Sequence, residues 1–98
     1  MTITRIGEMK AQNGQEEAVR LFFETVIMPA LDQSAGMQAY HLLQNRAEPT
    51  RFIFIELWDS IEQHQASVNN IDTRQIESVM KLLAGKPWGE YYSDNGVA

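Results

Sequence analysis

The chain has 98 residues, of which 44% are hydrophobic and 21% are charged, so we expect one globular domain over residues 1–98. Its formal net charge is −5 and its eight lysines and arginines are scattered, which argues against nucleic acid as a partner because nucleic acid needs a clustered basic surface. The chain has no cysteine, no signal peptide and no apolar run near the roughly 20 residues of a membrane span, so we expect a cytoplasmic protein without disulfides or membrane contact.

The first predicted elements are a strand and a long helix. Residues 3–11 read as a strand that ends before Asn13 and Gly14. Asn13 is a candidate helix cap, with Glu16 as its reciprocal partner three residues later. A helix is predicted over residues 15–31, with a bend or an end at Pro29, because apolar side chains recur at spacings of three and four. These side chains are Val19, Phe22, Phe23, Val26, Ile27 and Ala30.

A hairpin is predicted next. Gly36 marks the turn into a strand over residues 37–45, and the turn at residues 47–50 leads into a third strand over residues 51–58. The third strand is apolar at nearly every position, and Glu56 is the one carboxylate inside it. A strand that is apolar on both sides must be covered on both faces.

A short helix over residues 61–68 follows the third strand. Ser60 and Gln63 form its capping signature. His64 shares one side of this helix with Ile61 and Val68, so we expect the histidine to point inward.

A second short helix and a last strand complete the chain. Asn69 and Asn70 break the preceding helix, and Asp72 is a candidate cap for a helix that runs to about Leu83. The predicted apolar face of this helix consists of Ile76, Val79, Met80 and Leu83. Gly85 and Pro87 stop the helix, residues 88–93 read as a strand, and residues 94–98 are expected to fray.

This order of elements, β-α-β-β-α-β, predicts an α+β, ferredoxin-like fold with an antiparallel sheet. Right-handed crossovers place both helical segments on the same face of that sheet. The opposite face would then expose apolar surface on the order of several hundred Å², near the limit for monomers. We therefore predict a homodimer in which two sheets pack face to face and form a dimeric α+β barrel.

The segment of residues 52–67 resembles the antibiotic biosynthesis monooxygenase family, a group of dimeric α+β barrels. The resemblance rests on an apolar strand that ends in Glu-x-Trp, a polar turn, and a His and a Ser on the next helix. Here these are Glu56, Trp58, His64 and Ser67. The turns and strand starts elsewhere extend the resemblance to nearly the whole chain.

The resemblance implies several activities. Family members include cofactor-free oxygenases acting on quinols and polyketide aromatics, haem-degrading enzymes, and an isomerase of a small signalling metabolite. The haem-degrading branch carries an Asn on its first strand, a Trp on its third strand and a His on its last helix. Only Trp58 matches, because Gly7 stands at the Asn position and the last helix has no histidine. Haem degradation is therefore disfavoured.

Glu56 and His64 are the candidate catalytic residues. Strand alternation places Glu56 on the same side as Phe52, Phe54 and Trp58, which we take as the side towards the helices. A carboxylate there must be hydrogen-bonded or protonated. It is either a general base or acceptor for a phenol, or a structural group bonded to a helix end or to His64. His64 is either a base for a phenol or quinol, or a structural link between its helix and the sheet.

The candidate substrate-binding residues are apolar, and each is equally compatible with plain core. They are Trp58, Phe22, Phe23, Phe52, Phe54, Met80 and Leu83. Further candidate proton donors, which strand polarity does not place, are Tyr40, Tyr91, Tyr92 and His41. No ligand-like spacing links Glu8, Glu56, His41 and His64, so no metal site is predicted.

The residues and the resemblance together predict a homodimeric, cofactor-independent monooxygenase of a small aromatic or quinol-like compound. The resemblance implies that the deprotonated substrate passes an electron to O2 without metal or flavin. Two alternatives stay open: a non-redox isomerase of the same fold that rearranges a small hydroxylated or phosphorylated metabolite, and a small-ligand binding protein without turnover.

Overall fold

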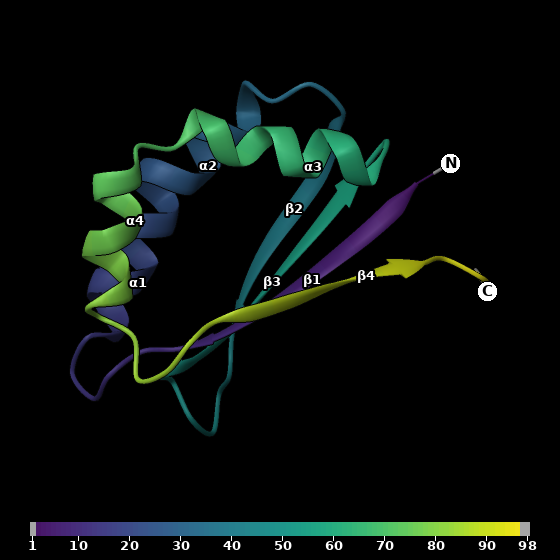
Figure 1. Cartoon of the computed structure of the whole chain (residues 1–98). Coiled ribbons are helices and arrows are strands. Elements are labelled where there is room, and N and C mark those ends of the chain that lie inside the picture. The colour runs from purple at the N-terminus through teal and green to yellow at the C-terminus, as the bar shows by residue number, and fades with distance from the viewer. Residues whose placement is uncertain (1, 97–98) are drawn as a thin grey trace.

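The computed structural model describes residues 2–96 (Figure 1). In chain order the elements are β1 (Ile3–Lys10), α1 (Glu16–Phe22), the π-helical turn η1 (Phe23–Ile27), α2 (Met28–Asp32), β2 (Met37–Gln44), β3 (Arg51–Trp58), α3 (Ile61–Ser67), the 3-10 turn η2 (Val68–Asn70), α4 (Thr73–Met80) and β4 (Trp88–Ser93). This order confirms the predicted ferredoxin-like α+β fold, with its second helical segment split in two.

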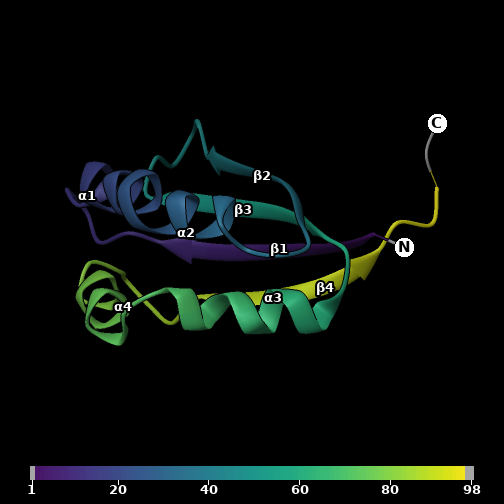
Figure 2. The same cartoon turned by 90° about the horizontal axis from the view of Figure 1, so that it is seen from above.

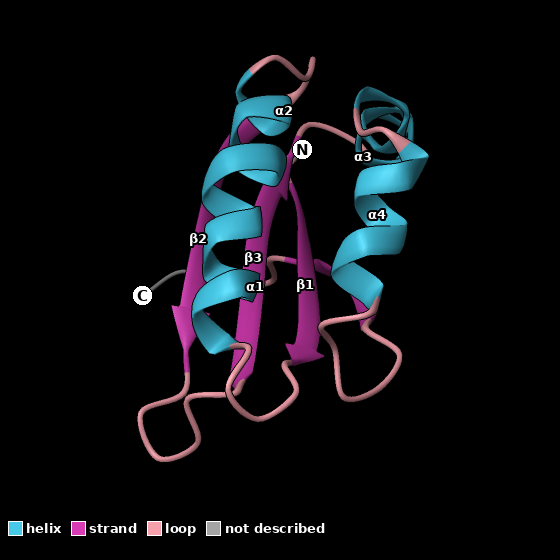
Figure 3. Ribbon diagram, turned by 90° about the vertical axis from the view of Figure 1, so that its left-hand side faces the viewer, coloured by secondary structure: helices cyan, strands magenta, loops and turns pink. Residues whose placement is uncertain are grey.

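The four strands form one antiparallel sheet in the order β2-β3-β1-β4. Both helical segments lie over the same face of this sheet (Figure 3). Seen from above, the α1–α2 run lies towards β3 and the α3–α4 run lies on the side of β4 (Figure 2). Among the described residues 2–96, no helix lies over the opposite face, called here the outer face. No helix within residues 2–96 combines the length and the apolar character needed to cross a bilayer.

Strand β3 alternates as predicted between the helices and the outer face. Phe52, Phe54, Glu56 and Trp58 are buried on the helix side. Across the ladder, Phe54 pairs with Gly7 and Glu56 pairs with Arg5, so these side chains share one face. The carboxylate of Glu56 therefore lies between the sheet and the helices, as its position in the strand indicated.

The core lies between the sheet and the helices and includes the largest fully buried side chains, Trp58, Phe52 and Val19. Phe23 and Leu31 reach it from the first helical segment, as the helical spacing of apolar residues indicated.

The start of α1 differs from the prediction. The residue at the N-cap is Gln15, without a side-chain capping bond, so the prediction of Asn13 as the cap is wrong. Gly14 adopts a φ of 87°, a left-handed conformation suited to glycine, and this turn leaves Asn13 two residues before the cap. The Glu16 carboxylate instead accepts a hydrogen bond from the backbone N–H of Gly14 at 3.1 Å.

The helix continues to Asp32, one residue beyond the predicted extent, so of the two outcomes expected at Pro29, a bend or an end, the helix does not end there. The π-helical turn η1 immediately precedes the segment that contains Pro29. Proline lacks an N–H and its ring crowds the carbonyl four residues earlier, and a widened π turn is one way for a helix to absorb that disruption. Phe22, Phe23 and Ile27 lie at or in this turn.

The caps of α3 and α4 are confirmed. Ser60 Oγ accepts from the backbone N–H of Gln63 at 3.2 Å, and the Asp72 carboxylate accepts from that of Arg74 at 2.8 Å. Gly36 turns the chain into β2 with a φ of 85°. Val68 begins the turn η2 instead of ending α3 and is 47% exposed, although it lines the same cavity between sheet and helices as His64.

The end of α4 lies earlier than predicted. The helix stops at Met80, and Leu83 instead forms an isolated bridge with Ala11, beyond the end of β1. Met80 is 40% exposed, so it lies at the edge of the predicted apolar face.

Candidate active site

A cavity of about 390 Å³ lies between the sheet and the two helical segments. This volume falls within the range of about 300–1,000 Å³ that is typical of small-molecule sites. Of the predicted site residues, those that line it are Phe22, Phe23, Phe54, Glu56, His64, Met80 and Leu83. Phe52 and Trp58 do not line it. The cavity thus brings together both candidate catalytic residues and five of the candidate substrate-binding residues.

One part of the cavity is aromatic. The rings of Phe23 and Phe54 lie with centroids 4.9 Å apart and tilted by 45°, and Phe22 meets Phe23 edge-on. Ile27 and Leu31 continue this lining from the first helical segment. The β1 residue opposite Phe54 is Gly7, which adds no side chain to the floor of the cavity. This part of the cavity therefore presents apolar and aromatic side chains.

Glu56 supplies a carboxyl group to the cavity and is 5% exposed. Its Oε1 accepts a hydrogen bond from Trp58 Nε1 at 3.1 Å, and its Oε2 lies 3.7 Å from Arg5 Nη1. Burial raises the pKa of the Glu56 carboxyl, an effect that the Trp58 hydrogen bond and the Arg5 charge oppose. These partners lie on β3 and β1, rather than at a helix end or at His64.

His64 lines the same cavity from α3. Its Nδ1 lies 2.5 Å from the Tyr91 hydroxyl oxygen, and its ring stands edge-on to the rings of Trp58 and Tyr91. Burial, helped by the charge of Arg5, lowers the pKa of His64 to about 4, so the imidazole is neutral at pH 7. A neutral imidazole can accept a proton, and with Nδ1 bonded to Tyr91 the second ring nitrogen is the one left for a ligand.

Arg5 lines the cavity, and Tyr91, which does not line it, contacts His64 from behind. Residue Tyr91 on β4 pairs with Arg5 on β1, which in turn pairs with Glu56 on β3, so three neighbouring strands supply one row of side chains. The Arg5 guanidinium carbon lies 5.9 Å from the centroid of the Tyr91 ring. Tyr91 was one of four unplaced candidate donors in the sequence, and Arg5 was not a candidate at all. Only the pairing of β1 with β3 and β4 places Arg5 and Tyr91 near Glu56, and this pairing cannot be inferred from a short stretch of sequence.

The remaining candidates lie elsewhere. Tyr40 donates its hydroxyl to Asp32 at 2.7 Å, and Tyr92 donates to Glu90 at 3.0 Å. Strand pairing places Tyr92 and His41 on the outer face. Within residues 2–96, no three His, Cys, Asp or Glu side chains gather closely enough to hold a metal ion.

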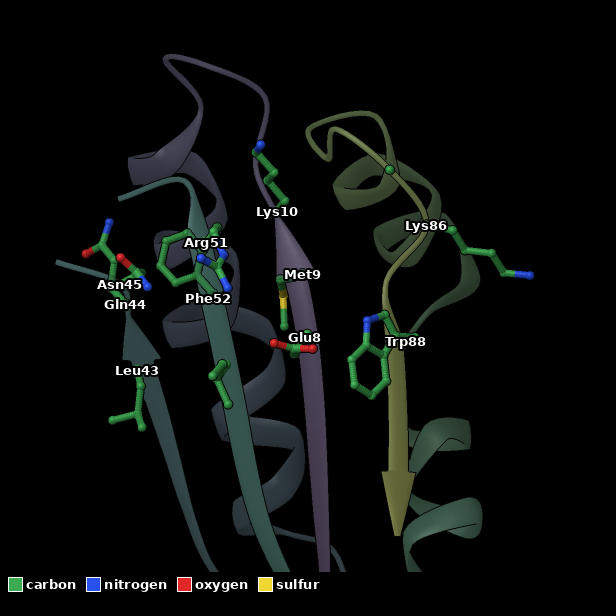
Figure 4. A pocket seen from close by; sticks show the side chains of 12 residues that line it. Glu8, Met9, Lys10, Leu43, Gln44, Asn45, Arg51, Phe52, Lys86 and Trp88 are labelled. Atoms are coloured by element: carbon green, nitrogen blue, oxygen red, sulfur yellow. The ribbon is translucent and has the colours of Figure 1, made fainter. Parts of the chain in front are cut away.

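Trp58 and Phe52 are buried beside the cavity rather than in its wall. Trp58 is 0% exposed and acts on the site through its hydrogen bond to Glu56 and its edge contact with His64. Phe52 borders a separate hollow of about 330 Å³ at the end of the sheet near the β2–β3 turn (Figure 4). The cavity lining thus gives no support to a direct ligand contact by either residue.

Acid is expected to destabilise the fold through His64. Its folded pKa of about 4 lies below the ordinary value of 6.5, so as the pH falls the unfolded chain takes up the proton first. The contribution of His64 to stability is complete above pH 6.5 and is lost as the pH falls towards 4. Urea unfolding across this window should show a smaller loss of stability for His64→Gln than for the parent. The matched control is His41→Gln, which removes the exposed histidine; an equal acid response of His64→Gln and the parent would contradict the prediction.

Comparison with known proteins gives a family and several structural neighbours. The model of the family described as antibiotic biosynthesis monooxygenase matches residues 2–77. No curated protein matches the chain.

Solved structures share the fold at low sequence identity. SnoaB from Streptomyces nogalater, a cofactor-independent oxygenase, aligns with a TM-score of 0.82 and 10% identity over 98% of this chain and 95% of its own. NE2512 from Nitrosomonas europaea, a protein of unknown function, aligns with a TM-score of 0.81 and 19% identity over 99% and 92%. SO0527 from Shewanella oneidensis aligns with a TM-score of 0.78 and 24% identity over 93% and 88%. At these identities the likeness concerns the fold alone.

Proposed function

Because the chain belongs to the antibiotic biosynthesis monooxygenase family, we propose that it is a cofactor-independent monooxygenase of a small aromatic or quinol-like compound. The observation that carries the proposal is the composition of the cavity: an apolar, aromatic chamber lined also by Arg5 and Glu56 from the sheet and by His64 from α3, with Tyr91 bonded to His64 from outside the lining. An apolar pocket with a few convergent polar groups of perturbed pKa is the usual form of an enzyme site.

Proton removal is the step that the side chains support. A phenolic ring held against Phe23 and Phe54 presents its hydroxyl to the polar row. The neutral imidazole of His64 takes the proton on Nε2, in the tautomer whose Nδ1–H donates to the Tyr91 hydroxyl oxygen, and this hydrogen bond holds the ring. The charge of Arg5 stabilises the resulting phenolate, an interaction that is stronger in a partly buried site than in water.

Oxygen then reacts with the electron-rich anion. The anion passes one electron to O2, and the two radicals combine into a carbon-bound peroxide, which receives the proton back. At an anthrone-type CH2 carbon, the peroxide eliminates water: the C–H and O–O bonds break, one oxygen atom stays as the new carbonyl and the other leaves as water. The balance requires only the substrate and O2. SnoaB, described as a cofactor-independent oxygenase, is a precedent for such chemistry on this fold.

Oxygen uptake tests the proposal. Hydroquinones and anthrones are added to the protein in an oxygen-electrode cell without added metal or flavin, with buffer blanks for autoxidation. We expect uptake above the blank that is proportional to protein and unaffected by a chelator. No uptake with any of these compounds would remove the oxygenase; a product formed without O2 consumption would indicate an isomerase, and tight binding without product would indicate a binding protein.

We also propose that the protein is a homodimer formed through the outer face of the sheet. Apolar side chains on this face come from all four strands: Ile6, Leu43, Ile53, Ile55, Leu57 and Trp88. Trp88 is 51% and Leu43 49% exposed. Figure 4 views this side, with Leu43 and Trp88 on the two edge strands and the helices behind the sheet. A second copy of the same face would cover these side chains.

A charge at the centre of the outer face should disrupt that dimer. Ile55 pairs with Ile6 on β1 and His41 on β2, so it lies in the middle of the sheet. Light scattering is expected to give the parent about twice the 11.2 kDa chain mass and to shift Ile55→Asp towards the single-chain mass. Leu21→Asp is the matched control, because Leu21 is an exposed apolar residue of α1. A parent of single-chain mass at micromolar concentration would contradict the dimer.

A further inference from the structure

The Arg5 side chain extends along the sheet towards the floor of the cavity. Although Arg5 pairs with Glu56 and Tyr91, its guanidinium lies over the next pair of residues, Gly7 and Gly89. A Cβ built at Gly89 would lie 2.5 Å from Nη2 and 2.6 Å from Cζ of Arg5, and one at Gly7 would lie 3.4 Å from Nη1. The guanidinium therefore occupies the room that a side chain at position 89 would need.

Surrounding groups neutralise this guanidinium only in part. Its one ion pair within residues 2–96 is to Glu56 at 3.7 Å, longer than the approximately 2.7–2.9 Å of a charge-assisted hydrogen bond. Burial raises the pKa of that carboxyl, an effect that the Trp58 hydrogen bond and the Arg5 charge oppose. Tyr91 offers its ring face, and the strand alternation places the side chain of Glu8 on the outer face. The side chain of Arg5 is only 26% exposed, so solvent replaces few of the missing partners.

We infer that Arg5 is an anion-binding group of the cavity, and that the ligand is an aromatic compound carrying a carboxylate or phosphate substituent. The planar guanidinium presents several N–H donors in a fork that matches either oxyanion. The inference uses the cavity of the proposed function and therefore rests on it, and it narrows the substrate class from any small aromatic compound to an aromatic acid or phosphate ester.

The positions of the neighbouring rings restrict how the anion is attached. Gly7, beneath the guanidinium, pairs with Phe54, whose ring contacts that of Phe23. Neighbouring strands lie about 4.8 Å apart. A ligand whose anionic group binds Arg5 can therefore place its aromatic ring against Phe54 only if that group is attached to the ring directly or through one or two atoms. His64 lines the same cavity.

Anaerobic calorimetry with three matched probes tests this inference. The probes are hydroquinone, 2,5-dihydroxybenzoate and 4-hydroxyphenyl phosphate, which share a phenolic ring and differ in the anion. Hydrogen bonds to charged groups contribute about 1.5–3 kcal/mol, so we expect at least one anionic probe to bind roughly 10- to 100-fold more tightly than hydroquinone. The tighter of the two identifies the substituent.

Two variants test separately whether anion binding needs the positive charge of Arg5 and whether it needs the guanidinium at its present position. Arg5→Gln should abolish the preference for the anionic probe, so that the ratio of its affinity to that of hydroquinone falls to about one. Gly89→Ala keeps the arginine but displaces its guanidinium, and should reduce the preference as well. Arg74→Gln removes the same charge from the exposed start of α4 and should leave all affinities unchanged.

Equal affinity for all three probes, a preference that survives Arg5→Gln, or no binding of either anion would overturn the inference. Because binding is measured without O2, the anion site can hold while the oxygenase fails. Conversely, oxygen uptake with a neutral hydroquinone can support the oxygenase while the preference for an anion is absent.

Discussion

Replacing Trp58 by alanine is expected to lower the free energy of unfolding by about 3–5 kcal/mol, the range for truncating a buried aromatic side chain. Trp58 is 0% exposed and is among the largest fully buried side chains. Its removal leaves a void beneath the sheet and takes away the hydrogen bond to Glu56 Oε1, inside a low-dielectric region where an unpaired carboxyl is costly. A domain of this size has a total stability of about 5–15 kcal/mol, so the variant should be close to unfolding.

Urea unfolding at one fixed protein concentration measures this effect, since self-association would make stability depend on concentration. Trp58→Phe is the matched variant: it keeps an aromatic ring but loses the N–H donor, and should cost about 1–3 kcal/mol. The order parent, phenylalanine, alanine is therefore expected. A loss below about 1 kcal/mol for Trp58→Ala would show that the indole is not the centre of this core.

Replacing His64 by glutamine is expected to lower kcat by about 10²–10⁴-fold, the usual contribution of a general base, with little change in KM. The amide keeps a polar contact with Tyr91 but has no basic nitrogen. Because the pKa of His64 lies at about 4, protonation of this histidine should lower the activity of the parent only in the acid range. At neutral pH the activity should not change with pH on account of His64. The oxygen-uptake assay, run with the best substrate found, gives both readouts.

Tyr91→Phe distinguishes a positioning role from a catalytic one. It removes the hydroxyl that lies 2.5 Å from His64 Nδ1 and should reduce kcat less than His64→Gln does, while shifting the acid limb of the pH profile. Gln65→Ala, an exposed change on the same helix, is the control for folding of α3. A kcat for His64→Gln within about threefold of the parent would exclude the histidine as the base.

The side of the sheet that Glu56 occupies was predictable because strands have a period of two. Phe52, Phe54, Glu56 and Trp58 are spaced by two residues, so one buried member indicates the side of the others. Helix caps at Ser60 and Asp72 were predictable for a similar reason, since a cap bonds to a backbone N–H only two or three residues away.

Where the sequence reading was wrong, a neighbouring turn had overridden the local pattern. The left-handed Gly14 moved the start of α1 past Asn13. At Pro29 only the expected end is absent, and a π-helical turn precedes the segment that contains the proline. The 3-10 turn η2 begins at Val68, which therefore lies beyond the end of α3 and is 47% exposed. The prediction assumed a regular α-helix of 3.6 residues per turn, and left-handed, π-helical and 3-10 residues depart from that regular geometry.

The sequence by itself determined the order of elements, the ferredoxin-like fold class and the inward direction of Glu56 and His64, because these depend on periodicities and turns within short segments. A single domain over residues 1–98 and a cytoplasmic location stay predictions. The tertiary structure alone decided that Arg5 and Tyr91 join the site, that Trp58 and Phe52 stay outside the cavity wall, and that Gly89 makes room for a guanidinium. The reason is physical: cross-strand register and the fit of side chains depend on contacts between distant segments, which the free energy of the whole fold sets.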